Sequence, residues 1–266
     1  MREVERFYDK DPSIEWKRLE KNRIEFDMTK KYLNHFLKPG SKILDVGGGP
    51  GRYAIYLSEG GHEVSLVDLS SKNLELAREK AEENGITLRN YIHANALNLS
   101  ETVEGMFDAV LCFGPLYHLV TEDDREKAIG ECLKRLKPGG LLFTAFISAF
   151  APINDCVTYY PKGIIGYKDQ LINYTKDGVN IVSKDNPGFT TAYFIDPMAI
   201  TPLMEKFEIE TLAITGLEGL LAQTKDAIMS LPDEAYDEWL DLNFQLATNP
   251  VTWAGSEHML HIGRKK

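Results

Sequence analysis

The sequence predicts an α/β protein built on a mostly parallel sheet with helices on both faces. Short apolar runs of strand length alternate with longer amphipathic segments of helix length, a pattern typical of repeated strand–helix–strand units. The first of these runs leads directly into a glycine-rich turn, in the segment 43–53 with the sequence ILDVGGGPGRY. A chain of 266 residues is long enough for one such domain with its own core.

Hydrophobic period and breaking residues give the elements in order. Two N-terminal helices are expected at 1–20 and 22–37. Strands are expected at about 42–46, 63–68, 88–93, 107–113 and 141–148, and helices between them at about 51–60, 71–84 and 122–137. After these, we expect a helix from Asp196 to about Lys206, a sixth strand at 207–214, a helical segment at 217–247 and a final strand at 257–263.

These elements divide a single domain, 1–266, into four parts. Residues 1–40 are expected to form a helical cover, 41–149 the core, and 193–266 the C-terminal half of the sheet with its helical insertion at 217–247. Residues 150–192 are too long for a simple connection and contain four tyrosines and several Gly-bounded polar turns. We expect this segment to be an inserted lid over the substrate, with β-rich structure.

Composition limits the partners and the compartment. The net charge of −10, with dispersed basic residues, argues against a nucleic-acid partner, which normally requires a basic face. No apolar stretch is long enough to span a membrane, and the N-terminus lacks the apolar core of a secretory signal. The three cysteines show neither a disulfide framework nor zinc spacing, so reduced cytoplasm is the expected location.

The glycine-rich turn indicates a ligand site. It follows a buried strand that carries Asp45, and its glycines let backbone approach a ligand closely because no Cβ intervenes. Seventeen residues after Gly51, the next strand ends at Asp68, where a carboxylate can accept hydrogen bonds from both hydroxyls of a ribose. The spacing departs from the dinucleotide fingerprint, and Asp45 would repel a diphosphate but suits the ammonium group of an amino acid.

The segment resembles the first motif of the class I S-adenosylmethionine-dependent methyltransferases, D/E-x-G-x-G-x-G. The resemblance continues through a fourth strand introduced by Phe107-Asp108 and through the turn Lys137-Pro138-Gly139-Gly140 before the fifth strand. It covers residues 41–149 in the expected order. It implies a Rossmann-like, seven-stranded sheet whose last strand runs antiparallel beside the sixth. It also implies S-adenosylmethionine as cofactor and S-adenosylhomocysteine as product.

The resemblance assigns further residues to the cofactor site. Gly47 and Gly49 are expected contacts, whereas Gly51 serves either contact or helix–strand packing. Leu69 is expected either against the adenine or in the core, and Ala96 is expected in the cofactor site. Asn95 stands where such enzymes usually have an Asp, so it is either an adenine contact or a turn asparagine. Cys112 and Phe113 end the fourth strand beside the methionine part of the cofactor.

The loop after the fourth strand is the expected meeting point of cofactor and acceptor. It carries Tyr117 and His118, and histidine is the side chain best suited to removing a proton near neutral pH. His118 is therefore a candidate general base, or else a residue that caps the next helix or bonds a backbone carbonyl. Tyr8 and Trp16 belong to an N-terminal aromatic stripe and are candidate substrate contacts, and no catalytic metal is expected.

A small-molecule acceptor methylated at O, N or S is the favoured function, with a monomer or homodimer as the expected state. The Asn/Asp/Ser-Pro-Pro-Tyr/Phe tetrad of amino-methylating enzymes is absent, since the corresponding segment contains Gly114-Pro115. A protein- or RNA-directed methyltransferase and a non-catalytic S-adenosylmethionine binder remain the alternatives. The acceptor itself cannot be inferred, because the cofactor carries the chemistry and specificity resides where motifs are fewest.

Overall fold

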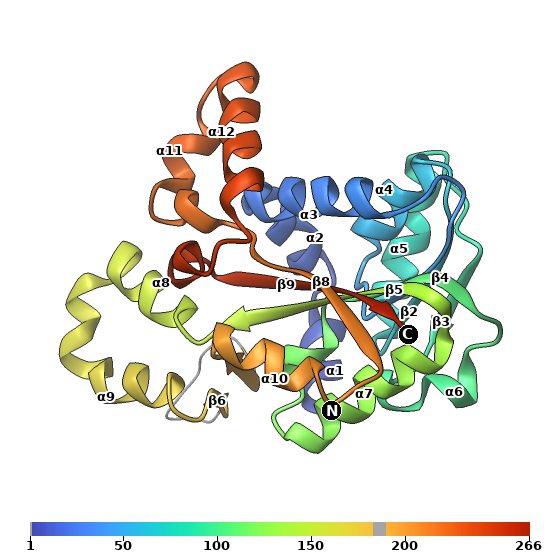
Figure 1. The fold of residues 1–266 in the computed structure, drawn as a ribbon, viewed down its shortest axis with the longest axis horizontal. Coiled ribbons are helices and arrows are strands. Elements are labelled where there is room, and N and C mark those ends of the chain that lie inside the picture. Colours follow the sequence, from blue (N-terminus) through green and yellow to red (C-terminus); the bar gives the residue numbers. More distant parts are fainter. Residues whose placement is uncertain (1, 183–189) are drawn as a thin grey trace.

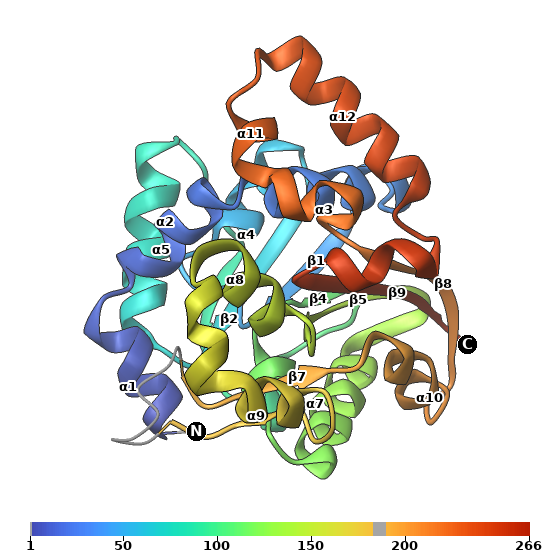
Figure 2. The same ribbon diagram turned by 90° about the vertical axis from the view of Figure 1, so that its left-hand side faces the viewer.

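A central β-sheet with helices on both faces organises the protein (Figure 1; Figure 2). The computed structural model describes residues 2–182 and 190–266. Five parallel strands in the order β3-β2-β1-β4-β5 form one half of the sheet. Their bounds are β1 (Lys42–Val46), β2 (Glu63–Asp68), β3 (Asn90–His93), β4 (Phe107–Cys112) and β5 (Leu136–Ser148).

The other half of the sheet is antiparallel. The final strand β9 (His258–Lys265) pairs in antiparallel orientation with β5 on one side and with β8 (Ile209–Gly216) on the other. This confirms the predicted orientation of the last strand beside the sixth. The described residues contain nine strands rather than the predicted seven, because two short strands, β6 (Val179–Asn180) and β7 (Ala192–Ile195), are added. β7 pairs in parallel with the last two residues of β5, beyond the point where β4 ends.

Alternate strand residues enter two hydrophobic clusters, one on each face of the sheet. In β1, Ile43 belongs to one cluster and Leu44 and Val46 to the other, as expected for strands covered on both sides. One face is covered by α3 (Arg23–Phe36), α4 (Arg52–Glu59), α5 (Ser71–Glu83), α11 (Lys225–Met229) and α12 (Asp233–Leu246). The opposite face is covered by α6 (Leu99–Thr102), α7 (Glu122–Arg135) and α10 (Ile200–Met204).

The N-terminal cover differs from the prediction in one respect. The expected helix at 1–20 is two helices, α1 (Arg2–Lys10) and α2 (Ser13–Lys21). The break falls at Asp11-Pro12 because proline disfavours helical backbone at the preceding residue and has no N–H to donate. The Asp11 carboxylate accepts hydrogen bonds from the backbone N–H and hydroxyl of Ser13 across the break.

The insertion after β5 is mainly helical, so the predicted β-rich structure at 150–192 is wrong for its described residues; 183–189 lie outside them. It contains α8 (Ala151–Tyr159) and α9 (Ile164–Tyr174) before the short strand β6. Proline in the first turn of α8 is compatible with a helix start, and Leu171 and Tyr174 lie one turn apart on α9. Both pack against Phe194 of β7, which the tyrosine-rich sequence did not predict.

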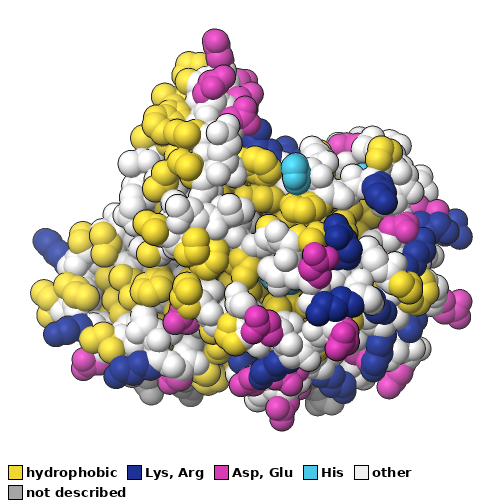
Figure 3. Space-filling view, viewed as in Figure 1, with side chains coloured by type: hydrophobic (Ala, Val, Ile, Leu, Met, Phe, Trp, Pro, Cys, Tyr) yellow, Lys and Arg dark blue, Asp and Glu magenta, His cyan; other side chains and the backbone are white. Residues whose placement is uncertain are grey.

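The outer surface of the insertion is apolar. The side chains of Ile165, Tyr160, Val157 and Tyr167 are 90%, 71%, 61% and 60% exposed, and Figure 3 shows hydrophobic side chains gathered over this part of the molecule. A patch of this kind is typical of a surface that contacts a partner or a ligand. Among the described residues, no helix is both long and apolar enough to cross a membrane.

Candidate active site

The turn after β1 has little room for side chains. A Cβ on Gly47, whose φ is 68°, would lie 2.6 Å from Cδ of Pro115, and a Cβ on Gly48 would lie 2.4 Å from Oδ2 of Asp45. The backbone N–H of Gly47 donates to the carbonyl of Val67 over 2.7 Å, which ties the turn to the end of β2. The turn therefore brings bare backbone to the carboxyl edge of the sheet.

Asp68 ends β2 with its carboxylate held in place. Oδ2 accepts from the backbone N–H of Gly49 over 2.8 Å, while Oδ1 accepts from the backbone N–H of Ser70 over 2.8 Å and from Nδ2 of Asn73 over 3.1 Å. A carboxylate offers about four lone-pair sites, so capacity remains for a ligand hydroxyl. Burial raises the pKa of Asp68 despite these hydrogen bonds.

Asp45 is a fully buried carboxyl group in β1. Neither of its oxygens has a hydrogen-bond partner among the described residues. Burial, followed by the charge of Asp68, raises the pKa of Asp45 from 3.8 to about 7. A buried carboxylate without a partner is costly, and an ammonium group in the adjacent cavity would compensate it. This orphaned carboxylate fits the amino-acid part of S-adenosylmethionine.

One cavity joins the turn to the N-terminal helices and the far half of the sheet. It encloses about 1210 Å³ of empty space, its open mouth included. The predicted site residues that line it are Tyr8, Asp45, Gly47, Gly49, Asp68, Leu69, Ala96, Phe113, Tyr117 and His118. The structure thus brings together the cofactor residues and both residues predicted at the catalytic centre.

Four predicted site residues do not line this cavity. Gly51 begins α4, and a Cβ there would lie 3.2 Å from Cβ of Ala77, so its observed role is helix packing. The side-chain oxygen of Asn95 accepts from the backbone N–H of Leu97 over 2.9 Å, which is the turn role that the sequence left open. The amide oxygen of Asn95 thus accepts a hydrogen bond from the protein's own backbone.

Cys112 and Trp16 also lie off the cavity. Cys112 is fully buried in the sheet core, where Cys132 hydrogen-bonds it, and burial helps to raise its thiol pKa. The ring of Trp16 packs against the guanidinium group of Arg52 and the ammonium group of Lys80, at 5.1 and 5.5 Å from the ring centroid. Cation–π packing between helices explains its place outside the cavity.

Tyr8 and His118 form a hydrogen-bonded pair in the cavity wall. Tyr8 Oη lies 2.9 Å from Nε2 of His118, and Nδ1 of His118 lies 3.3 Å from the backbone carbonyl of Thr191. Because a carbonyl only accepts, Nδ1 carries the ring proton, and Nε2 accepts from the Tyr8 hydroxyl. Burial lowers the pKa of His118 to about 4, so the imidazole is neutral at physiological pH.

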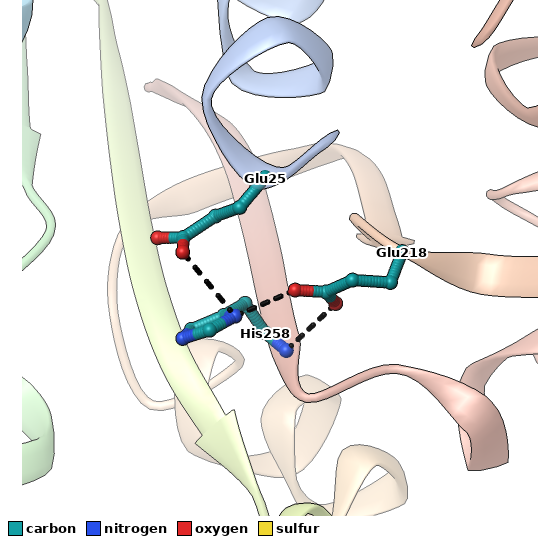
Figure 4. Close-up of side chains that lie close together, drawn as sticks. All are labelled: Glu25, Glu218 and His258. Atoms are coloured by element: carbon teal, nitrogen blue, oxygen red, sulfur yellow. Dashed lines mark hydrogen bonds and ion pairs between the residues drawn. The ribbon is translucent and has the colours of Figure 1, made fainter. Parts of the chain in front are cut away.

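A charged network that sequence reasoning missed lies at the other end of the cavity (Figure 4). Arg18 of α2 donates to both oxygens of Glu25 of α3, over 2.6 and 3.2 Å. Nδ1 of His258, the first residue of β9, lies 2.6 Å from Oε1 of Glu218 and 3.6 Å from Oε2 of Glu25. Arg18, Glu25 and His258 line the cavity.

Two electrostatic effects oppose each other at His258. Burial alone would lower its pKa, but the carboxylates of Glu25 and Glu218 outweigh burial and raise the pKa to about 9. Glu218 Oε2 also accepts from the backbone N–H groups of Glu257 and His258 over 3.1 and 3.0 Å, which fixes its carboxylate. His258 is therefore an imidazolium at neutral pH, and Nδ1 donates to Glu218.

Glu25, Glu218 and His258 also have the composition and spacing of a metal site, with one ligand atom from each within 4.8 Å of the others. These atoms already have partners, because Glu25 accepts from Arg18 and Nδ1 of His258 carries a proton. A metal would have to displace the proton on Nδ1 and compete with Arg18 for Glu25. In this structure the three residues are connected as an ion-pair network, and the predicted absence of a catalytic metal stays a prediction.

The sequence offered only weak signals for this network. Glu25 is a buried acid among the apolar residues of α3, and burial of Glu usually requires a partner. His258 and His261 are three positions apart on β9, so their side chains lie on opposite faces of the strand. His261 is buried between Thr144 and Thr211 and is not among the residues that line the cavity.

Comparisons with known proteins agree with the fold and with the predicted cofactor. A family model described as "Methyltransferase domain" matches residues 43–140. The ubiquinone biosynthesis O-methyltransferase of Idiomarina loihiensis is 28% identical over 81% of this chain and 82% of its own length. The enzyme of the same name from Vibrio atlanticus is 30% identical over 67% of each chain. The structure of magnesium protoporphyrin IX methyltransferase from Synechocystis PCC 6803 with bound S-adenosylhomocysteine superposes with a TM-score of 0.58 at 13% identity, covering 99% of this chain and 98% of that one.

The Rossmann-like sheet, the glycine turn and the two acids define a nucleoside-cofactor enzyme of the methyl-transferring class. The chain belongs to the class I S-adenosylmethionine-dependent methyltransferases. It is an enzyme that uses S-adenosylmethionine to methylate a small-molecule acceptor.

Proposed function

We propose that the protein transfers the methyl group to an oxygen atom of a small hydroxylated acceptor. The observation that carries this proposal is a single cavity that the cofactor residues share with a second set of polar groups, Tyr8, Tyr117, His118 and His258. The curated relatives that are similar over most of the chain are named as O-methyltransferases, which favours oxygen over nitrogen or sulfur.

The cofactor half of the site is proposed to act as follows. Asp45 pairs with the ammonium group, Asp68 accepts from the ribose hydroxyls, and Gly47 and Gly49 allow backbone contact. Leu69, Ala96 and Phe113 supply apolar walls of the cavity. S-adenosylmethionine supplies a methyl group on a cationic sulfonium, so the protein's task is mainly alignment and exclusion of water.

Tyr117, His118 and Tyr8 are proposed to shape the acceptor half. Tyr8 of α1 crosses over to His118 and thereby joins the N-terminal cover to the loop after β4. Such a contact between distant segments can close the cavity over the acceptor, and it gives the N-terminal helices a role in excluding water. The lid role of 150–192, a cytoplasmic location, the lack of a nucleic-acid partner and a monomeric or homodimeric state stay predictions.

Cofactor binding and product analysis test the proposal. S-adenosylhomocysteine should bind in calorimetry and raise the melting temperature, whereas NAD should do neither. Incubation with methyl-labelled S-adenosylmethionine and four probes (phenol, catechol, an alkylamine and an alkylthiol) should label the hydroxylated probes. Labelling of only the amine or the thiol would refute oxygen as the acceptor atom, while labelling of RNA or protein would favour the alternative class of acceptor. Tight cofactor binding without turnover on any acceptor would favour the non-catalytic binder.

A further inference from the structure

We propose that His258, oriented by Glu218, is the catalytic base that takes the proton from the acceptor hydroxyl during methyl transfer. This inference rests on the proposed oxygen acceptor. Glu218 is a positioning residue, since it contacts the imidazole rather than the cavity contents.

The strand register places His258 on the acceptor side of the site. Cys112 of β4 is level with Thr144 of β5, and Ile147 of β5 is level with His258 of β9. His258 therefore lies three residues further toward the carboxyl edge than the end of β4, on the side of the sheet away from β1 and β2. The cofactor acids end β1 and β2, so His258 faces the same cavity from its opposite half.

The geometry of the ring leaves one nitrogen for the acceptor. Nδ1 is committed to Glu218 over 2.6 Å. Nε2 has no hydrogen-bond partner among the described residues, and Figure 4 shows it pointing away from both carboxylates. An imidazole in the wall of a cavity, held through Nδ1 by a carboxylate and with Nε2 left without a partner among the described residues, has the arrangement that general-base catalysis requires.

The charges around the ring favour proton uptake. The groups that act on it from the surrounding elements are Glu25 of α3, Glu218 before α11, Arg18 of α2, Asp155 of α8 and the neighbouring Glu257. Arg18 opposes protonation, whereas the carboxylates favour it and give the ring a pKa of about 9. The ring is therefore mostly protonated at neutral pH, and its neutral form, which accepts the proton, becomes the major species only above about pH 9. His118, with a pKa of about 4, is neutral at physiological pH but is a much weaker base.

The step balances in atoms and charge. The acceptor O–H bond breaks and its proton passes to Nε2 of neutral His258, which becomes an imidazolium. The acceptor oxygen forms the new bond to the methyl carbon, and the methyl–sulfur bond breaks with its electron pair remaining on sulfur. The imidazolium then releases its proton to solvent, so no oxidant, reductant or metal is needed.

Nuclear magnetic resonance of ¹⁵N-histidine-labelled protein, saturated with S-adenosylhomocysteine, tests the geometry without turnover. His258 is assigned by its absence from His258→Asn, a variant whose amide still donates to Glu218. Its pKa should lie above 8 in the wild type and fall by at least one pH unit in Glu218→Gln, which keeps an oxygen for the backbone N–H groups. Added catechol should shift its Nε2 resonance. An ordinary pKa, or an Nε2 that does not respond to catechol, overturns the proposal.

Rates with the hydroxylated probes test the chemistry. The value of kcat/KM should rise about tenfold per pH unit up to about pH 9, because only the neutral imidazole accepts a proton. His258→Asn should lower it about 10²-fold or more, with S-adenosylhomocysteine affinity within twofold of wild type. Glu218→Gln should move the rising part of the pH–rate profile, its limb, to lower pH. If the limb reported ionisation of the acceptor hydroxyl instead, this substitution would not move it.

Three controls separate this role from others. His118→Asn, the same change at the other cavity histidine, should leave the position of the limb unchanged, and His35→Asn on the exposed face of α3 should leave the rate unchanged. Chelation with EDTA should have no effect; a rate lost with EDTA and restored by Mn²⁺ or Zn²⁺ would make the cluster a metal site and overturn the proposal. If only the amine or thiol probe is methylated, the proposed transfer to oxygen is wrong. If a hydroxylated probe is methylated but Glu218→Gln does not shift the pH–rate profile, only the role of His258 is refuted.

Discussion

Replacing Asp45 by Asn should reveal the cost of keeping a carboxylate in the cofactor site. The carboxyl group is fully buried, has no hydrogen-bond partner among the described residues, and has a pKa of about 7. Between pH 3.8 and 7 the native state therefore holds a proton that the unfolded chain has released. The contribution of Asp45 to the free energy of unfolding therefore falls as pH rises through that window. Above pH 7 the carboxylate is ionised, and the destabilisation reaches its full value.

The magnitude follows from the rise in pKa from 3.8 to about 7. At about 1.36 kcal/mol for each pKa unit, the ionised group lowers the free energy of unfolding by roughly 4 kcal/mol above pH 7. About 2 kcal/mol of this develops between pH 5.5 and pH 8. Asn at this position still buries an amide, which lowers stability equally at both pH values, so the comparison between pH values isolates the charge.

Urea unfolding followed by circular dichroism at pH 5.5 and pH 8 measures the effect. The free energy of unfolding of Asp45→Asn, relative to wild type, should be about 2 kcal/mol more favourable at pH 8 than at pH 5.5. Asp169→Asn, a change at an exposed aspartate of α9, should follow wild type at both pH values. Saturating S-adenosylhomocysteine should reduce the difference, because its ammonium group compensates the carboxylate. Equal differences at the two pH values would refute the reasoning.

Three further predictions follow from contacts in the site. Asp68→Ala should weaken S-adenosylhomocysteine binding by roughly 2–4 kcal/mol, since charge-assisted hydrogen bonds to the ribose are lost, and calorimetry showing affinity within twofold of wild type would exclude Asp68 as the ribose ligand. His118→Ala should lower the free energy of unfolding by about 1 kcal/mol, because the Tyr8 hydroxyl loses its acceptor; loss of an acidic limb in the pH–rate profile would instead show that His118 is a base. Gly48→Ala should lower the free energy of unfolding by about 1–3 kcal/mol, because its Cβ would lie 2.4 Å from Oδ2 of Asp45. Gly130→Ala, in an open part of α7, should instead raise it by about 0.5–1 kcal/mol. Urea unfolding of both variants measures the two effects.

The parallel half of the sheet and the cofactor half of the site could be predicted because their signals are local. Each parallel strand is a short apolar run, and the residues that meet at Asp45, Gly47 and Asp68 lie within 24 positions of one another. Turn chemistry there depends on neighbouring residues, so the glycine turn could be recognised from the sequence, and the resemblance to the methyltransferase motif assigned Gly47 and Gly49 to the cofactor. Asn95 shows the limit of this reasoning, because cap and ligand roles use the same amide oxygen.

Other parts depend on contacts that spacing does not encode. The insertion at 150–192 has few hydrophobic residues in a clear period, and its helices are stabilised by packing on β7, a strand of four residues. Trp16 had the residue type of a substrate contact, but its ring packs against Arg52 of α4 and Lys80 of α5 instead. In both cases tertiary packing decides the outcome, and amphipathic patterns do not specify which neighbour a residue meets.

The acceptor half of the site shows why specificity can change while the cofactor site remains the same. Arg18, Glu25, Glu218 and His258 come from α2, α3, the segment after β8 and the start of β9, and the antiparallel pairing of β9 with β5 and β8 brings them together. None of these four residues contributes to the turn that contains Gly47 and Gly49. On the proposed function, a substitution in the network would alter charge and proton affinity at the acceptor without replacing Asp45 or Asp68. Arg18 and Glu25 belong to the N-terminal cover and His258 to the final strand, so the proposal makes the two ends of the chain the places where variation would change the acceptor.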